Sequence, residues 1–336
     1  NAALNVRTVG ELVALVKAKG GAMSYETPGV AHFNHFATEV FNRRVGIKVP
    51  AVPYKGEAPM ITDLIGGQVD YGFGFAATVD PVVKAGRLRA LIGEVMQVPA
   101  GCEVLLGNGS DECIQYITAA VAREGAVVMA PTPSFAMFQL HALFYRLRFA
   151  GVMLRDDFSL DTEAFLDAMA KNKPALVWIA FPNNPTGNAF PIADIECIIR
   201  AAPGLVVLDE AYQPFAGATF MPRLMEFENM VVMRTVSKIG MAGLRLGYVC
   251  GRPEWIDAFN KTRSPFNINV LTEAVAIKLL EHKAVLDEQA AHVLQERNRV
   301  QAELLSLSGL TAYPSAANFV LVRIAGARGA GTRAFE

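Results

Sequence analysis

Five short apolar segments recur through the middle of this 336-residue chain, and they constrain its fold more than any other feature. Aliphatic residues dominate each segment, and stretches with a helical spacing of apolar residues separate them. Apolar runs of this length are typical of central strands that are buried on both faces of a sheet between helices. The sequence therefore predicts an α/β fold with a mostly parallel sheet, whose strands are Glu103–Leu106, Val127–Ala130, Ala175–Ala180, Leu205–Leu208 and Val231–Arg234.

The first part of the chain also alternates between helical and strand-like segments. Thr8 and Glu11 form a capping-box pattern at the start of a helix over Val9–Lys19. Such alternation predicts a second, smaller parallel sheet, because parallel strands need crossover connections. The remaining expected elements are strands at Met23–Tyr25, Lys48–Val52, 69–74 and 88–93 and helices at Phe33–Asn42, 57–66 and 78–85.

The length allows more than one domain, since single domains usually have roughly 100–200 residues. We expect an α/β segment over residues 1–95, a large domain over 96–265, and a long helix with a small α+β domain over 266–336. In the last region the helical pattern extends over about Val270–Leu307. Two short strands are expected after it, near Thr311–Tyr313 and Phe319–Val322.

Composition argues against several classes of function. The 31 Lys and Arg residues balance 32 Asp and Glu residues, so nucleic acid is not an expected partner. The four cysteines are scattered, and His32 and His35 have no third ligand nearby, so we expect neither a disulfide framework nor a metal site, and the two histidines are read as cap or cleft residues. No apolar run reaches the roughly 18 residues of a membrane span, and no signal peptide is visible, so we expect a cytoplasmic protein.

Polar residues follow four of the central strands, at the edge where open α/β sheets bind ligands. The segments are Gly107–Glu112, Phe181–Asn188, Asp209–Tyr212 and Thr235–Lys238. The first could be a phosphate cradle at a helix N-terminus, or only a glycine turn with a helix cap. Lys238 taken alone could be a solvated charge. The recurrence of such segments in this order favours one shared ligand site.

These segments carry a resemblance to a known family. Residues from about 96 to 323 resemble the fold-type I pyridoxal-phosphate aminotransferases, and within them the histidinol-phosphate aminotransferase family. The matching motifs are Gly-Asn-Gly-Ser-Asp-Glu at 107–112, Pro-Thr-Pro-Ser-Phe at 131–135, Asn-Asn-Pro-Thr-Gly-Asn at 183–188, Asp-Glu-Ala-Tyr at 209–212, Ser-Lys at 237–238 and Ala-Gly-Leu-Arg-Leu-Gly at 242–247.

The resemblance implies a role for each matching residue. Lys238 forms an imine with pyridoxal 5'-phosphate and later moves the substrate proton. Asp209 pairs with the pyridine nitrogen, which makes the ring an electron sink. Tyr212 and Asn184 hydrogen-bond the ring oxygen, and Phe135 stacks on the ring unless it is only a core aromatic. The cofactor phosphate is held by Ser110, Asp111, Ser237 and Arg245.

The implied reaction exchanges an amino group between L-histidinol phosphate and 2-oxoglutarate in histidine biosynthesis, in a homodimer. The family also has an N-terminal arm with an Asn-Glu-Asn-Pro-like segment and a tyrosine, and a C-terminal arginine that binds the substrate. We find no counterpart of these in the sequence. We therefore expect impaired substrate recognition and turnover.

Residues from about 1 to 94 resemble a different family, the second domain of the periplasmic receptors of tripartite-tricarboxylate transporters. The matching segments are 8–12, 23–29, 52–59 and 63–70. A carboxylate ligand would then lie at the loops 27–32 and 54–58, with Lys55 either a ligand contact or a solvated turn charge. Three interpretations follow: an aminotransferase fused to a receptor-like segment, a carboxylate-binding receptor fragment, or a chimeric chain without complete activity.

Overall fold

The computed structural model describes residues 4, 6, 8–19, 22–30, 32–74, 76–264 and 267–325. The chain forms two compact units, Asn1–Gly86 and Arg87–Glu336, and each is described by itself. The division lies before the expected boundary at residues 95 and 96. The end of the expected third region, residues 326–336, falls outside the described residues.

The first unit contains a three-stranded parallel sheet, as the sequence predicts, with the strand order β2-β1-β3. At the start of its first helix, Thr8 Oγ1 accepts a hydrogen bond of 3.1 Å from the Glu11 amide, which is half of the predicted capping box. The elements are α1 (Val9–Lys19), β1 (Tyr25–Thr27), α2 (Phe33–Val45), β2 (Ala51–Pro53), α3 (Glu57–Ile65) and β3 (Tyr71–Gly72).

The two histidines at the start of α2 have local roles. His32 is the N-cap residue, and its Nδ1 accepts a 3.4 Å hydrogen bond from the Asn34 amide. The His35 ring stacks on Tyr25, with 6.1 Å between the ring centroids. The reading of these histidines as cap or cleft residues agrees with this geometry. No group of three or more His, Cys, Asp or Glu side chains that could hold a metal ion occurs within the described ranges.

Glu26 is a carboxyl group buried in the middle strand of the first unit. Only 1% of its surface is exposed, and its Oε2 atom has no hydrogen-bond partner among the described residues. The side chain occupies space next to Gly72 that a Cβ atom there would take. Burial raises the pKa of Glu26 to about 7, and the nearby carboxylates of Asp63 and Glu57 contribute in the same direction.

We expect the stability of the first unit to fall as the pH rises between 4.5, the ordinary pKa of this group, and about 7. The folded unit holds the Glu26 proton in this interval, whereas the unfolded chain releases it. The loss above pH 7 is about 2 to 3 kcal/mol, and Glu26→Gln removes it. Hydrogen exchange of peptides from residues 23–72 in urea, at pH 5 and pH 8, measures it. Equal pH dependence in both proteins would contradict this assignment.

Residues 76–95, at the end of the first unit and the start of the second, differ from the prediction. A single helix, α4 (Ala76–Val95), replaces the expected helix over 78–85 and strand over 88–93. Leu88 and Ile92 are fully buried in the core of the second unit, and their spacing of four residues is that of one helix face. The strand prediction was wrong because a short apolar run fits either a strand or a buried helix.

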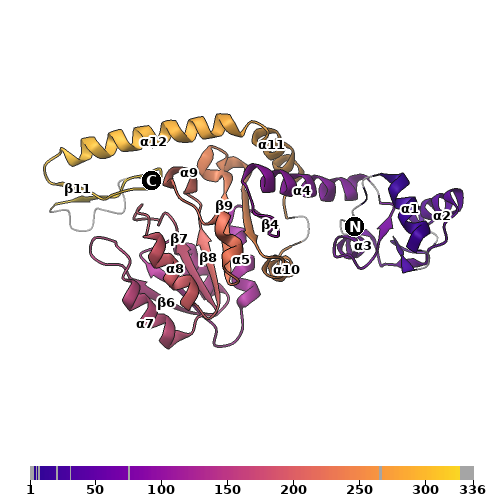
Figure 1. The fold of residues 1–336 in the computed structure, drawn as a ribbon, viewed down its shortest axis with the longest axis horizontal. Helices are drawn as coiled ribbons and strands as arrows, with labels where there is room; N and C mark the ends of the chain where they lie inside the picture. Colours follow the sequence, from indigo (N-terminus) through magenta and orange to yellow (C-terminus); the bar gives the residue numbers. More distant parts are fainter. Residues whose placement is uncertain are drawn as a thin grey trace. The chain divides into compact units, whose positions relative to one another are not determined.

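The second unit is built on a seven-stranded sheet in the order β4-β10-β9-β8-β7-β5-β6. Strands β7, β8 and β9 of this sheet are labelled at the centre of the unit in Figure 1. Strand β10 runs antiparallel to both of its neighbours, and the other pairs are parallel. The five predicted strands are all present, which confirms the mostly parallel sheet. The strands are β4 (Glu103–Asn108), β5 (Val127–Thr132), β6 (Arg148–Met153), β7 (Leu176–Ala180), β8 (Leu205–Asp209), β9 (Met230–Thr235) and β10 (Leu246–Gly251).

Helices cover both faces of this sheet. Along β7, Val177 and Ile179 join one core cluster, whereas Trp178 joins another on the opposite face. Helices α7 and α8 contribute to the first cluster and α5, α6 and α10 to the second. Their bounds are α5 (Ser110–Val121), α6 (Ala136–Phe144), α7 (Thr162–Asn172), α8 (Ile192–Ala201), α9 (Gln213–Ala216) and α10 (Pro253–Asn260).

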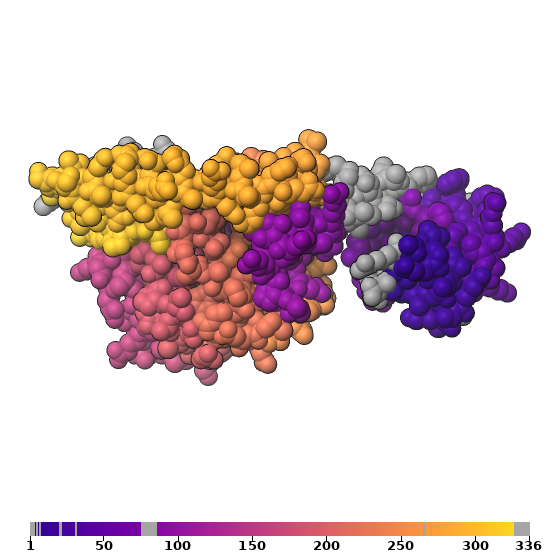
Figure 2. All heavy atoms as spheres, turned by 45° about the horizontal axis from the view of Figure 1, so that its top comes forward, coloured from indigo at the N-terminus to yellow at the C-terminus, as the bar shows by residue number. Residues whose placement is uncertain are grey.

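The C-terminal region carries two helices where the sequence predicts one. Helix α11 (Val270–Leu280) is followed by α12 (Lys283–Leu305), which lies along one side of the unit (Figures 1 and 2). Strands β11 (Leu310–Ala312) and β12 (Val322–Ile324) form an antiparallel pair. No helix within the described residues is long and apolar enough to cross a membrane.

Candidate active site

One cavity of about 120 Å³ in the second unit brings the predicted site residues together. Because β10 is antiparallel, it begins at the edge where the parallel strands end, so Arg245 reaches the same place as Asp209 and Lys238. All nine predicted residues line the cavity: Ser110, Asp111, Phe135, Asn184, Asp209, Tyr212, Ser237, Lys238 and Arg245. Their roles in binding and catalysis stay predictions.

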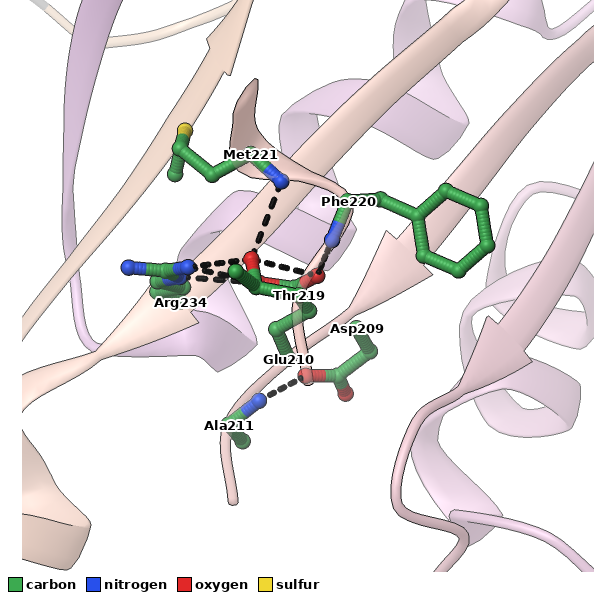
Figure 3. A network of polar contacts seen from close by, with 7 residues as sticks. All are labelled: Asp209, Glu210, Ala211, Thr219, Phe220, Met221 and Arg234. Atoms are coloured by element: carbon green, nitrogen blue, oxygen red, sulfur yellow. Dashed lines mark hydrogen bonds and ion pairs between the residues drawn. The ribbon is translucent and has the colours of Figure 1, made fainter. Parts of the chain in front are cut away.

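Asp209 forms the buried acidic part of the cavity. It is the last residue of β8, it is 5% exposed, and its Oδ1 accepts a 3.0 Å hydrogen bond from the Ala211 amide (Figure 3). Burial raises the pKa of this carboxyl to about 7, although the Ala211 hydrogen bond and the charge of Lys238 oppose the shift. The site thus holds a carboxylate that a cationic ligand group would stabilise.

Lys238 lies in the short 3₁₀ helix η4 (Val236–Ile239), which follows β9 directly. Thr235 caps this helix, with its Oγ1 accepting a 3.1 Å hydrogen bond from the Ser237 amide. The Lys238 Nζ atom lies 5.1 Å from the centre of the Tyr212 ring. The partly buried lysine therefore lines the cavity beside an aromatic ring.

Tyr212 and Asn184 form a polar pair at the cavity. Asn184 Nδ2 lies 3.4 Å from the Tyr212 hydroxyl, and the Tyr212 ring packs edge-on against Phe319. The preceding Asn183 is fully buried and has a structural role: its Nδ2 donates hydrogen bonds to Pro133 O and Thr186 Oγ1. The Asn-Asn motif thus divides into a loop-fixing residue and a cavity residue.

The opposite part of the cavity is suited to an anion. Gly109, with φ of 82°, precedes α5, and no side chain in the described part of the chain caps this helix. The amide groups of the first turn, at Ser110 and Asp111, therefore remain available at the positive end of the helix dipole. Gly247 permits this arrangement, because a Cβ atom there would lie only 2.6 Å from the Ser110 nitrogen.

Arg245 adds the cationic side chain of this part. Its Nη2 lies 3.1 Å from Asp111 Oδ2, and both side chains are about half exposed. The guanidinium lies close to Gly109, where any Cβ atom would collide with it. The backbone of Arg245 has a positive φ of 49°, which places the side chain over the start of α5.

Phe135 combines the two alternatives that the sequence left open. Its ring packs edge-on against Phe138, which itself stacks on the buried Trp178. Phe135 also lines the cavity. The residue is therefore a core contact and a cavity wall, and its stacking on a ligand stays a prediction.

Thr235 lines the cavity as well, although sequence reasoning named it only as the start of a polar segment and gave it no role in the site. Its Oγ1 lies 2.9 Å from Ser237 Oγ and 3.1 Å from the Leu246 carbonyl oxygen, so it joins the ends of β9 and β10. The available signal was its place at the end of an apolar strand, two positions before Ser237. A threonine that ends an apolar strand is common, and only the register between the strands reveals its contacts.

Two family models match the chain. The model of aminotransferase class I and II matches residues 85–330, which is most of the chain. The model of the tripartite tricarboxylate transporter family receptor matches residues 1–99. The first match contains every residue of the cavity, and the second contains the whole first unit and extends beyond it to residue 99.

Individual relatives agree with the first match. Histidinol-phosphate aminotransferase 2 of Cupriavidus pinatubonensis is 57% identical over 249 residues, covering 73% of this chain and 68% of the relative. Histidinol-phosphate aminotransferase 1 of Ralstonia nicotianae is 54% identical, covering 74% and 68%. The crystal structure of the Sinorhizobium meliloti enzyme with pyridoxal-5'-phosphate has a TM-score of 0.65 and 31% identity, covering 72% and 66%. The chain belongs to the aminotransferase class I and II family.

Proposed function

We propose that the protein is a pyridoxal-phosphate-dependent aminotransferase that exchanges an amino group between L-histidinol phosphate and 2-oxoglutarate. The observation that carries the proposal is the cavity, which combines a lysine, a buried aspartate and an anion-binding helix N-terminus. The names of the relatives and the cofactor in the Sinorhizobium meliloti structure support the choice of reaction and cofactor.

The residues present fit this cofactor. Pyridoxal phosphate carries a phosphate dianion, a basic ring nitrogen and an aldehyde, and the cavity has a complement for each. The uncapped start of α5 with Ser237 and Arg245 fits the phosphate. Asp209 fits a protonated ring nitrogen, because its buried carboxylate lacks a full counter-charge. Lys238 supplies the amine that reacts with an aldehyde.

Each of these residues has its own task in the proposed reaction. When bound, the cofactor supplies an electron sink for the carbanion that forms at the substrate Cα. Asp209 stabilises positive charge at the ring nitrogen. The Lys238 amine accepts the Cα proton and returns it, and the Tyr212 hydroxyl and the Asn184 amide hold the ring oxygen. Phe135 and Tyr212 form aromatic walls of the cavity.

A turnover assay tests the proposal. The protein is loaded with pyridoxal phosphate, supplied with L-histidinol phosphate and 2-oxoglutarate, and glutamate formation is measured. L-Histidinol without the phosphate is the matched control substrate. Bound cofactor without glutamate formation would overturn the assigned reaction, and it is the outcome expected of a chimeric chain without complete activity. Failure to bind the cofactor would overturn the whole proposal.

Substitution of Arg245 by glutamine is expected to weaken cofactor binding about 10- to 100-fold. A charge-assisted hydrogen bond to a phosphate contributes about 1.5 to 3 kcal/mol. Arg245→Lys should recover only part of this, because lysine keeps the charge but lacks the planar fork of donors. Titration of tryptophan fluorescence with pyridoxal phosphate measures the dissociation constant. Arg299→Gln on the exposed face of α12 is the control, and equal constants in the two glutamine variants would contradict the role.

The first unit supports a second candidate function, binding of a small carboxylate. Residues 1–95 would then form a receptor-like segment fused to the aminotransferase part. The Tyr54 amide donates a 2.8 Å hydrogen bond to the Thr27 carbonyl, which brings together the two loops predicted to hold the ligand, 27–32 and 54–58. Thermal shifts with small di- and tricarboxylates test this function, and no shift at millimolar ligand would argue against it. Homodimer formation, proposed from the family, and a cytoplasmic location, proposed from the absence of a visible signal peptide, stay predictions.

A further inference from the structure

A buried ion pair joins the two strands that lead to Asp209 and Lys238 (Figure 3). Arg234 Nε and Nη2 donate hydrogen bonds of 2.9 and 2.8 Å to Glu210 Oε2. The two side chains are only 9% and 0% exposed. Glu210 directly follows Asp209 in the chain, and Arg234 stands four positions before Lys238. The ion pair therefore connects the chain next to Asp209 with the chain just before Lys238, and the proposed reaction depends on both of these residues.

A third side chain completes the network. Thr219 Oγ1 lies 2.6 Å from Arg234 Nη2 and 2.8 Å from Glu210 Oε2, and it accepts a hydrogen bond from the Met221 amide (Figure 3). The Phe220 amide donates a 2.6 Å hydrogen bond to Glu210 Oε1. Both carboxylate oxygens of Glu210 thus have partners, and the loop at residues 219–221 is tied to the same pair.

The network also reaches the strand that carries Arg245. Tyr248 of β10 stands directly opposite Arg234 in the ladder between β9 and β10, and it is fully buried. Arg245 precedes β10 immediately. We call Glu210, Thr219, Arg234 and Tyr248 the strand clamp. It links the three strands that place the acid, the amine and the phosphate-binding arginine around one cavity.

Stability alone is a weak reason for such a cluster. Taking two charges out of water is costly, and well-packed apolar residues of similar volume stabilise a core equally well or better. An ion pair whose two carboxylate oxygens both accept hydrogen bonds does add a defined geometry. None of the clamp residues lines the cavity, so their effect on the site must pass through the positions of Asp209 and Lys238.

We propose that Glu210 and Arg234 are positioning residues that set the separation and orientation of the Asp209 carboxylate and the Lys238 amine. The inference rests on the proposed function, because the two groups must contact one cofactor. In Glu210→Gln, the hydrogen-bond acceptor for the Phe220 amide is kept, but the Arg234 charge loses its buried counter-ion. The end of β8 then shifts relative to the end of β9, and the unpaired cation lies near the cavity.

The test uses holoprotein and three readouts: the pH titration of the absorption band of the bound cofactor, the cofactor dissociation constant, and the separate values of kcat and KM. In Glu210→Gln we expect the titration midpoint to move by at least about half a pH unit. We expect kcat to fall about tenfold or more, while KM for the amino donor changes less than about threefold. The double variant Glu210→Gln, Arg234→Gln removes both charges and should move the midpoint back toward the wild-type value. Glu303→Gln, which breaks a surface ion pair on α12, is the control.

Two results decide against the clamp. One is a folded Glu210→Gln protein that loses thermal stability but keeps the wild-type midpoint, dissociation constant and kcat. If that variant does not fold, Thr219→Val replaces it, because it removes one clamp member without changing any charge; an unchanged midpoint there also overturns the proposal. Wild-type protein that shows no cofactor band would overturn the proposed function itself, and the clamp with it.

Discussion

Replacing Lys238 by alanine is expected to lower kcat by about 10⁴-fold or more and to remove the absorption band of the protein-bound cofactor. No other lysine lines the cavity, as far as the chain is described. The amine at this position has two tasks in the proposed reaction, covalent attachment and movement of the Cα proton, so its loss affects both. Steady-state kinetics and absorption spectra of the loaded protein measure the two effects separately.

The matched control for this variant is Lys278→Ala. Lys278 lies on α11, its side chain is 71% exposed, and its contact is a surface ion pair with Glu281. Such a pair contributes little to stability, so this variant should keep the wild-type spectrum and rate. Spectra of Lys238→Ala and Lys278→Ala that cannot be told apart would refute the assignment of Lys238. Addition of a small primary amine should partly restore turnover in Lys238→Ala if only the proton acceptor is missing.

Replacing Asp209 by asparagine is expected to lower kcat by about 10³-fold, because the ring nitrogen loses the carboxylate that keeps it protonated. Asp209→Glu keeps the charge but displaces it, so an intermediate rate is expected. Turnover of Asp209→Asn at the wild-type rate would exclude a role for this carboxylate. Because asparagine is nearly isosteric with aspartate, the comparison of the wild-type protein with Asp209→Asn measures the effect of the carboxylate charge on kcat.

The same substitution should stabilise the protein without cofactor. The pKa of Asp209 in the folded chain is about 7, above its ordinary value of 3.8, so the folded state holds a proton that the unfolded chain releases as the pH rises between these values. At pH 8 the wild-type apoprotein loses stability that asparagine retains, of the order of 3 kcal/mol. Below pH 4 the two proteins should be equally stable.

Urea unfolding followed by tryptophan fluorescence measures this difference, because Trp178 and Trp255 both belong to the second unit. Equal unfolding free energies of the wild-type protein and Asp209→Asn at pH 8 would show that the carboxylate is not strained. If the expectation is met, the carboxylate that the reaction needs lowers the stability of the empty site. Cofactor binding would then offset this by placing a positive charge beside it.

Much of the second unit could be predicted because its central strands are apolar over their whole length. The prediction does not include two strands of the sheet, β6 and β10, which lack a continuous apolar run for different reasons. Strand β6 lies at the edge of the sheet and mixes partly buried and exposed residues without a regular alternation, so its pattern is weak. Strand β10 is fully buried but has glycines near both ends, and Gly247 there meets the requirement of close approach to the start of α5.

The site residues could be found because each stands in a motif next to a strand end. The strand clamp could not, although its residues lie beside these motifs. Arg234 reads as the polar end of an apolar run, and Glu210 reads as one member of an acidic pair. Their pairing depends on β8 and β9 being neighbours in a definite register, with Asp209 opposite Met233. Local sequence carries no information on that register.

The strand order also determines when the sheet can be completed while the chain is being synthesised. Strand β4 leaves the ribosome before every other strand of its sheet, yet the strand that it pairs with in the described part of the chain is β10, the last of the seven to be made. Gly107 therefore has no strand partner until Gly247 has been synthesised, and until then the loop at the start of α5 lacks the neighbouring strand β10. A nascent chain that has already produced Asp209 and Lys238 still lacks a closed phosphate site, so cofactor capture during translation should be a late event.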